Sequence, residues 1–192
     1  MEPWKDMTDT ATGTLLTVAM DITGGPIGTV RSAHGTLTSF AEATRMLRAA
    51  TTPAEARNVA DHVVMDDRAP SGVLNGAIIE FLRLSGLHMS VHPLTQTWTD
   101  HRCDTIDHSR DAGKKLSTAA SMARAFENAL RRVRQMTVAL VPFSPTWTAW
   151  TSLIQRLAHD AVVTTALALH ALRRMRDAVA LEFDDASRIV NS

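Results

Sequence analysis

The sequence contains no tyrosine, one cysteine and three lysines among its 192 residues. A single cysteine, Cys103, excludes an intramolecular disulfide framework. The formal net charge is zero, from 20 basic and 20 acidic residues, which argues against a protein whose whole surface binds polyanions. With 45% apolar and 21% charged residues, the chain has the composition of a globular protein that buries a substantial core.

Long apolar runs are also scarce. The first residues lack the basic flank and the uninterrupted apolar run of a secretory signal. The longest uncharged stretch, residues 136–154 with a glutamine on each side, is interrupted by Pro142, Pro145 and four threonines. A membrane span needs about 20 predominantly apolar residues. We therefore expect no membrane segment and a cytoplasmic location.

Glycine is absent from the last 79 residues, because all nine glycines lie at or before Gly113. Glycine is the residue that most often ends helices and forms turns. The second half is therefore expected to form long uninterrupted helices, and the first half shorter elements. Together these features predict an all-α fold with three shorter helices followed by a long antiparallel helical hairpin.

The three shorter helices are predicted within residues 36–87. Apolar residues recur at helical spacing up to about residue 50. The sequence Thr52-Pro53-Ala54-Glu55 is a capping box with proline at the first helical position, and it predicts the start of a second helix. A third helix is expected from about Ser71 to Gly86. Residues 1–35 fit no element clearly, and Gly24-Gly25-Pro26 is expected to interrupt any helix there.

The hairpin is predicted within residues 116–184, after a polar connection at 88–115 and before a short tail at 185–192. Apolar residues in the hairpin alternate in steps of three and four, which is the spacing of a heptad seam. Ser144 and Pro145 are expected to cap the second helix of the hairpin.

The heptad seam gives the leading functional hypothesis, a non-enzymatic α-helical interaction or assembly protein that forms a homo-oligomer, with a dimer expected. The apolar seam is wider than one partner helix covers. The side chains predicted to self-associate are Phe126, Leu130, Val133, Trp147, Trp150, Ile154 and Leu157.

Charge is distributed unevenly along the chain and gives an alternative function. Residues 1–109 carry eight basic and thirteen acidic side chains, whereas residues 110–176 carry eleven basic and three acidic ones. The basic segment could pair with the acidic half, or it could contact the phosphates of a nucleic acid. The candidate phosphate-binding residues are Arg124, Arg131, Arg132, Arg134, Arg156, Arg173, Arg174 and Arg176.

The predicted polar connection contains several side chains of the types that bind transition metals. These candidate ligands are His88, His92, His101, Cys103 and His108. Their spacing matches no structural zinc motif, and Pro93 is expected to prevent His88 and His92 from sharing an undisturbed helix. The connection is therefore interpreted mainly as a polar, solvated loop.

A second alternative is a metal-dependent helical hydrolase. The His159-Asp160 dipeptide is similar to the His-Asp pair of helical metal-dependent phosphohydrolases, with His108 upstream and Asp177 or Asp184 downstream. Nucleophile motifs, phosphate-binding loops and dinucleotide fingerprints are absent. Without them the sequence names no catalytic residue and no cofactor, and it favours a protein that is not an enzyme.

Overall fold

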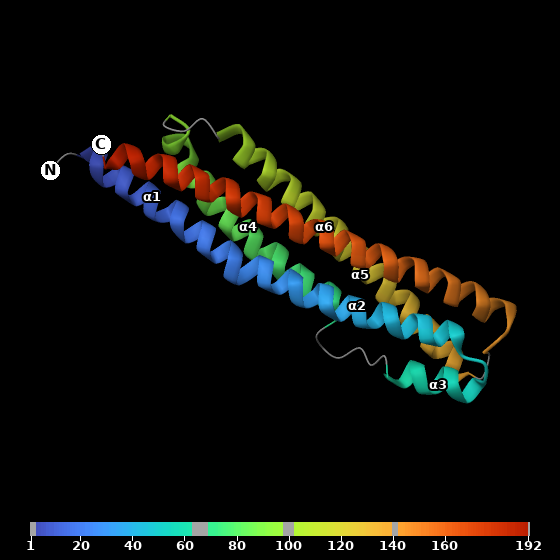
Figure 1. Cartoon of the computed structure of the whole chain (residues 1–192). Helices are drawn as coiled ribbons and strands as arrows, with labels where there is room; N and C mark the ends of the chain where they lie inside the picture. The colour runs from blue at the N-terminus through green and yellow to red at the C-terminus, as the bar shows by residue number, and fades with distance from the viewer. Residues whose placement is uncertain (1–2, 63–68, 98–101, 140–141, 192) are drawn as a thin grey trace. The chain divides into compact units, whose positions relative to one another are not determined.

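The computed structural model describes residues 3–62, 69–97, 102–139 and 142–191. These residues form α-helices and one π-helical segment, without a strand, so the predicted all-α class is confirmed (Figure 1). In chain order the elements are α1 (Pro3–Ile22), η1 (Thr23–Ile27), α2 (Gly28–Ala49), α3 (Pro53–His62), α4 (Pro70–Thr95), α5 (Arg102–Val138) and α6 (Pro145–Val190).

The first 35 residues are helical, and the expectation that Gly24-Gly25-Pro26 interrupts a helix is wrong. These residues lie in the π-helical segment η1, which connects α1 directly to α2. Ile22 and Gly28, on either side, both keep right-handed helical dihedral angles. A π-helical turn alters the i→i−4 hydrogen-bond ladder locally, so the chain can pass a proline that has no N–H to donate.

Two predicted helix starts are confirmed by their side-chain hydrogen bonds. At the start of α3 the backbone N–H of Glu55 donates to the Thr52 hydroxyl at 3.2 Å, and the backbone N–H of Thr52 donates to the Glu55 carboxylate at 3.3 Å. At the start of α6 the backbone N–H of Trp147 donates to the Ser144 hydroxyl at 3.1 Å. Each bond satisfies a backbone group that has no partner within its own helix.

The predicted polar connection at 88–115 is mostly helical instead. Helix α4 continues to Thr95, and α5 begins at Arg102. Pro93 lies inside α4, yet it does not separate His88 from His92. The missing N–H of Pro93 removes only a bond to the carbonyl of Met89, whereas the helical turn from His88 to His92 lies before the proline.

Helices α2, α4, α5 and α6 each contribute residues to both of two compact units. Unit 1 comprises residues 1–30, 76–116 and 167–192, and unit 2 comprises residues 31–75 and 117–166. Each unit has its own apolar core. Fully buried side chains include Leu15, Ile22, Leu84, Leu172 and Met175 in unit 1, and Leu37, Leu74, Phe126 and Ile154 in unit 2.

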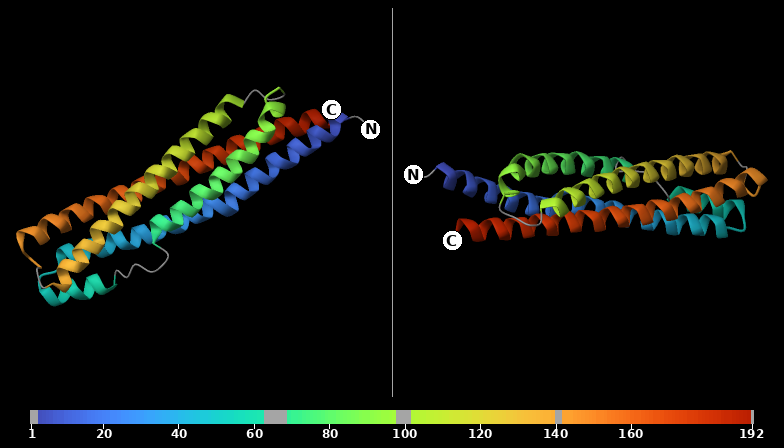
Figure 2. Two further views of the ribbon diagram at one scale, coloured as in Figure 1. Left: turned by 180° about the vertical axis from the view of Figure 1, so that it is seen from behind. Right: turned by 90° about the horizontal axis from the view of Figure 1, so that it is seen from above.

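Unit 1 packs α4 closely against its neighbours, and two glycines make this possible. A Cβ atom at Gly113 of α5 would lie 3.0 Å from the Phe81 ring of α4. A Cβ atom at Gly25 would lie 3.3 Å from Cγ of Glu80 in α4. Figure 2 shows α4, drawn in green, from two further directions. A side chain larger than that of glycine at Gly113 would therefore collide with Phe81 on this side of α4.

None of the helices in the described part of the chain is both long enough and apolar enough to cross a membrane.

Candidate functional site

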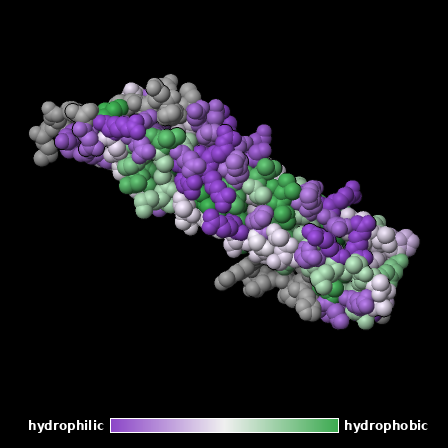
Figure 3. All heavy atoms as spheres, viewed as in Figure 1, coloured by the Kyte–Doolittle hydropathy of each residue, from purple (hydrophilic) through white to green (hydrophobic). Residues whose placement is uncertain are grey.

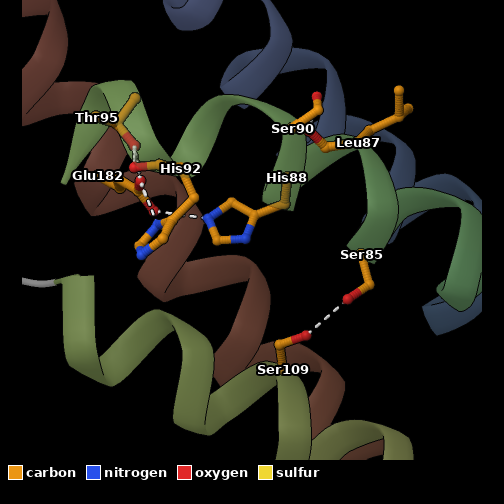
Figure 4. A network of polar contacts seen from close by, with 8 residues as sticks. All are labelled: Ser85, Leu87, His88, Ser90, His92, Thr95, Ser109 and Glu182. Atoms are coloured by element: carbon orange, nitrogen blue, oxygen red, sulfur yellow. Dashed lines mark hydrogen bonds and ion pairs between the residues drawn. The ribbon is translucent and has the colours of Figure 1, made fainter.

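Two histidines of α4 are buried in unit 1. His88 has no exposed surface, and His92 is 4% exposed. They are four residues apart, so they lie one above the other on the same face of the helix. Their ring centroids are 5.2 Å apart, with the rings tilted by 46°. This face of α4 therefore places two imidazoles side by side in the protein interior (Figure 4).

A carboxylate from α6 lies against both imidazoles. Oε2 of Glu182 is 2.8 Å from Nε2 of His88, and Oε1 is 3.4 Å from Nδ1 of His92. The Thr95 hydroxyl, one turn beyond His92, donates a hydrogen bond to Oε1. Glu182 is fully buried. Figure 4 shows the three α4 side chains pointing toward this one carboxylate, and we call His88, His92 and Glu182 the His–Glu cluster.

The environment of Glu182 favours the ionised carboxylate. Burial acts to raise the pKa of Glu182, because a charge is costly away from water. Hydrogen bonds with His88 and Thr95, together with the proximity of both imidazoles, outweigh this effect and hold its pKa below the ordinary value. The cluster therefore contains a buried negative carboxylate next to two imidazole rings.

Two nitrogen atoms in the cluster lack a hydrogen-bond partner. Within the described part of the chain, the buried side-chain atoms without one are Nδ1 of His88 and Nδ1 of His92. Buried polar atoms are nearly always hydrogen-bonded, because an unsatisfied one costs about 1–3 kcal/mol. Two such atoms in one small cluster mark it as a place with unused binding capacity.

The structure brings together two of the five predicted metal ligands, His88 and His92. His101 lies outside the described residues, as does the side chain of Cys103. His108 lines a pocket of about 210 Å³ beside Arg174 and Asp177. Among the described residues, the histidines and acidic side chains that approach closely enough to share one ion are His88, His92 and Glu182, whose ligand atoms all lie within 4.8 Å of one another.

Glu182 was missed by sequence reasoning because it follows His88 by 94 residues. A signal was present nonetheless. Met175, Val179 and Ala186 form a buried stripe on α6, and Glu182 occupies a position on the same stripe. A glutamate on an apolar helix face predicts a buried carboxylate with a dedicated partner, although the pattern does not identify that partner.

The predicted His-Asp constellation is not assembled within either unit. His159 and Asp160 are exposed residues of α6 in unit 2, where they line a groove of about 1010 Å³. His108, Asp177 and Asp184 belong to unit 1. The described side chains therefore provide no joint metal site for this set.

The side chains predicted to self-associate lie inside unit 2. Phe126 and Ile154 are fully buried, and Leu130, Val133 and Trp147 are 4% exposed or less. Trp150 and Leu157 are half-buried. The heptad seam is consequently used for the core of the chain itself, and these residues do not form a free surface for a second copy.

An exposed apolar face is found instead on α4 in unit 1. Ile79 is 70% exposed, Leu82 is 61% exposed and Met89 is 48% exposed. They follow the heptad steps 79, 82, 86 and 89, in which the remaining position is the exposed Gly86. We call Ile79, Leu82, Gly86 and Met89 the α4 outer face. Other apolar patches interrupt the hydrophilic surface on the side of the molecule drawn in Figure 3.

The eight candidate phosphate-binding arginines are exposed or half-buried. In the described part of the chain, the one that forms an ion pair is Arg176, with its neighbour Asp177 at 2.6 Å. The expected pairing of these arginines with the acidic half is therefore not found within the described chain. Five belong to unit 2, namely Arg124, Arg131, Arg132, Arg134 and Arg156, and three belong to unit 1.

No family model, curated protein or solved structure matches this chain.

Proposed function

We propose that the protein is a non-enzymatic helical assembly protein that associates with a second copy of itself through the α4 outer face. The observation that carries this proposal is the exposure of Ile79, Leu82 and Met89 along one line of a helix. A helix that is apolar on every side is ordinarily covered on every side. Helix α4 is covered on one side by its own unit, and a second copy would cover the other.

The charges around the α4 outer face permit two identical surfaces to meet. The charged side chains of α4 are Glu80 and Arg83, whose carboxylate and guanidinium groups are 2.7 Å apart. Arg83 also pairs with Asp21 of α1 at 3.2 Å. These three groups carry one net negative charge in each copy, and they are solvent-exposed, so salt screens the repulsion between two copies at this face.

The exposed glycines suggest how two α4 helices would fit. A Cβ atom at Gly76 or Gly86 would have no neighbouring atom within 4 Å, so both positions are open to the outside. In an antiparallel pair centred between Leu82 and Arg83, Ile79 of one copy lies over Gly86 of the other, and Met89 lies over Gly76. Large side chains then fill the space above glycines in a two-fold arrangement, which is the commonest symmetry of soluble dimers.

Analytical ultracentrifugation of an Ile79→Glu/Leu82→Glu variant tests the proposal. The wild-type chain is expected to sediment as a dimer at high micromolar concentration, and the variant as a monomer with unchanged helix content. The variant should still fold, because both substituted side chains are exposed.

Val138→Glu is a matched control, because Val138 is 73% exposed but lies on α5 in unit 2. This variant is expected to remain a dimer. A wild-type chain that stays monomeric at high micromolar concentration would overturn the proposal. So would a dimer that persists in the double variant.

We also propose that α5 and α6 form a long antiparallel hairpin. The support is the short connection between Val138, where α5 ends, and Pro145, where α6 begins. Helices joined by so few residues usually pack as antiparallel neighbours.

Nucleic-acid binding is the second candidate function. Its support is a groove in unit 2 with a net positive charge. Three arginines line it, Arg45, Arg48 and Arg156, against two acidic residues, Glu42 and Asp160. Such a basic groove would bind phosphates with an affinity that falls steeply as salt concentration rises. Titration of a fluorescent DNA duplex at two salt concentrations, with wild type and Arg156→Glu, tests it. No binding at low salt would eliminate this candidate.

A further inference from the structure

The His–Glu cluster has the donor atoms of a metal site, and these atoms all lie within 4.8 Å of one another. In a tetrahedral zinc site with bonds of about 2.0–2.1 Å, two ligand atoms lie about 3.3 Å apart. Nδ1 of His92 and Oε1 of Glu182 are 3.4 Å apart, which is longer than a good hydrogen bond but close to this ligand spacing. Nε2 of His88 and Oε2 of Glu182 are 2.8 Å apart, so this pair would have to separate by about half an ångström.

A hydrogen-bonded network accounts for only part of the cluster. One imidazole N–H of His88 satisfies Oε2 of Glu182, and the Thr95 hydroxyl satisfies Oε1. The second imidazole then adds little, because Nδ1 of His92 faces the carboxylate without forming a hydrogen bond. If that nitrogen carries a lone pair, it faces a negative oxygen, and a cation between the two atoms converts this repulsion into two bonds.

We propose that His88, His92 and Glu182 bind one divalent first-row transition ion, with Zn²⁺ as the best-fitting ion. Imidazole nitrogen and carboxylate oxygen are ordinary ligands of Zn²⁺, whereas Ca²⁺ and Mg²⁺ select sites made of oxygen alone. Thr95 is a positioning residue, because its hydroxyl orients the carboxylate without contacting the ion.

The burial of the cluster assigns the ion a structural role. All three side chains are at most 5% exposed, so a substrate has no access to the ion in this conformation. Binding would connect α4 to α6 across 94 residues of sequence. An ion that binds only the folded chain stabilises the fold. The three side chains leave one position of a tetrahedral ion open, and a water molecule would fill it.

Isothermal titration of untagged, EDTA-treated protein with ZnCl₂ tests the proposal. Wild type is expected to bind one Zn²⁺ per chain with micromolar or tighter affinity. His92→Gln is expected to bind at least 100-fold more weakly, since a ligand is lost outright. This variant should fold, because His92 makes no hydrogen bond to the carboxylate. Co²⁺ should give the intense visible absorption of a tetrahedral site with wild type and not with His92→Gln.

Two control variants separate this site from other sources of zinc binding. His159→Gln removes an exposed histidine of unit 2, and Glu127→Gln alters a buried carboxylate of unit 2. Both variants are expected to bind Zn²⁺ as wild type does. Thermal unfolding gives a second readout, with wild type gaining about 5 °C or more in Tm when free Zn²⁺ exceeds Kd a hundredfold.

Two results would overturn the proposal. One is the absence of stoichiometric Zn²⁺ binding by wild type together with an unchanged Tm, which would make the cluster a hydrogen-bonded network only. The other is equal affinity of wild type and His92→Gln, which would place bound zinc elsewhere.

Discussion

Among the described residues, each unit buries one glutamate, and the two carboxylates are compensated in different ways. Glu127 in unit 2 is 1% exposed, and it accepts hydrogen bonds from the backbone N–H of Ser71 at 2.7 Å and from the Ser71 hydroxyl at 2.6 Å. Ser71 lies in the first turn of α4, where backbone N–H groups lack helical partners and the helix dipole favours a negative charge. The carboxylate and the helix end satisfy each other.

Glu182 in unit 1 is compensated by side chains alone. Its partners are His88, His92 and Thr95, and two imidazole nitrogen atoms remain without a hydrogen bond. A serine and a helix end can act only as hydrogen-bond donors to a carboxylate here, whereas imidazole nitrogen can also bind a metal ion. Burial of a carboxylate therefore does not by itself indicate a functional site. The chemistry of its partners decides whether the carboxylate can also take part in metal binding.

Glu182→Ala is expected to have the largest effect on stability. It removes the hydrogen-bond acceptor of His88 and Thr95, and the carboxylate that lies against His92, while these groups remain buried. Breaking a buried pair of this kind typically costs about 3–5 kcal/mol in the free energy of unfolding. Urea denaturation followed by circular dichroism measures the change. A loss below about 1 kcal/mol would show that Glu182 is not needed to satisfy its buried partners.

Glu127→Ala is expected to cost less, about 2 kcal/mol in the free energy of unfolding, because the lost bonds are hydrogen bonds to a charged group. Urea denaturation again provides the measurement. Zinc binding should be unchanged, in contrast to Glu182→Ala, which should abolish it. Equal effects of the two variants on zinc binding would remove the proposed difference between the carboxylates.

Gly86→Ala is expected to have opposite effects on the fold and on the assembly. Alanine in an open helical position should stabilise α4 by about 0.5–1 kcal/mol, because glycine loses more conformational entropy on folding. The added methyl group should weaken the dimer, since it occupies the space proposed for Ile79 of the second copy. Gly13→Ala, at an open position on α1, is the control and should stabilise without changing the sedimentation coefficient.

The smallest effect on stability is expected from the titration of Glu55, an exposed glutamate that caps its own helix. A backbone hydrogen bond from Thr51, followed by one from the Thr51 hydroxyl, holds the pKa of Glu55 below its ordinary value. A carboxyl with a lowered folded-state pKa contributes its full stabilisation above its unfolded pKa of about 4.3 and loses it as pH falls through the folded value. An NMR pH titration should show the Glu55 side chain titrating below an unstructured glutamate.

The three glutamates also show which side-chain partners can be predicted from the sequence. The partners of Glu55 lie three and four residues away, so its capping role follows from the local sequence and is confirmed. Ser71 is 56 residues from Glu127, and His88 is 94 residues from Glu182. No local pattern relates residues at such distances, because the pairing depends on which helices pack together.

A local pattern does not show which helices pack together, and this also explains why the predicted self-association residues are found in the core. The apolar steps from Phe126 to Val133 correctly predicted an apolar helix face, but the pattern does not say whether the chain itself or a second copy covers that face. Tertiary packing buries it within unit 2. Histidine as a residue type predicts metal ligands, but the expected disruption by Pro93 is not found, since a proline affects only the helix bonds that reach past it.

The sequence by itself determined the all-α class, the starts of α3 and α6 and the unbroken helices of the second half. These features depend on hydrogen bonds and side-chain periodicity within a few residues of chain. Only the tertiary structure decided that Glu182 meets His88 and His92 in a buried cluster and that Ile79, Leu82 and Met89 remain exposed. Both outcomes depend on how α4 packs against its neighbours in unit 1, through contacts such as Gly113 with Phe81, and no local pattern encodes contacts between residues so far apart in the sequence.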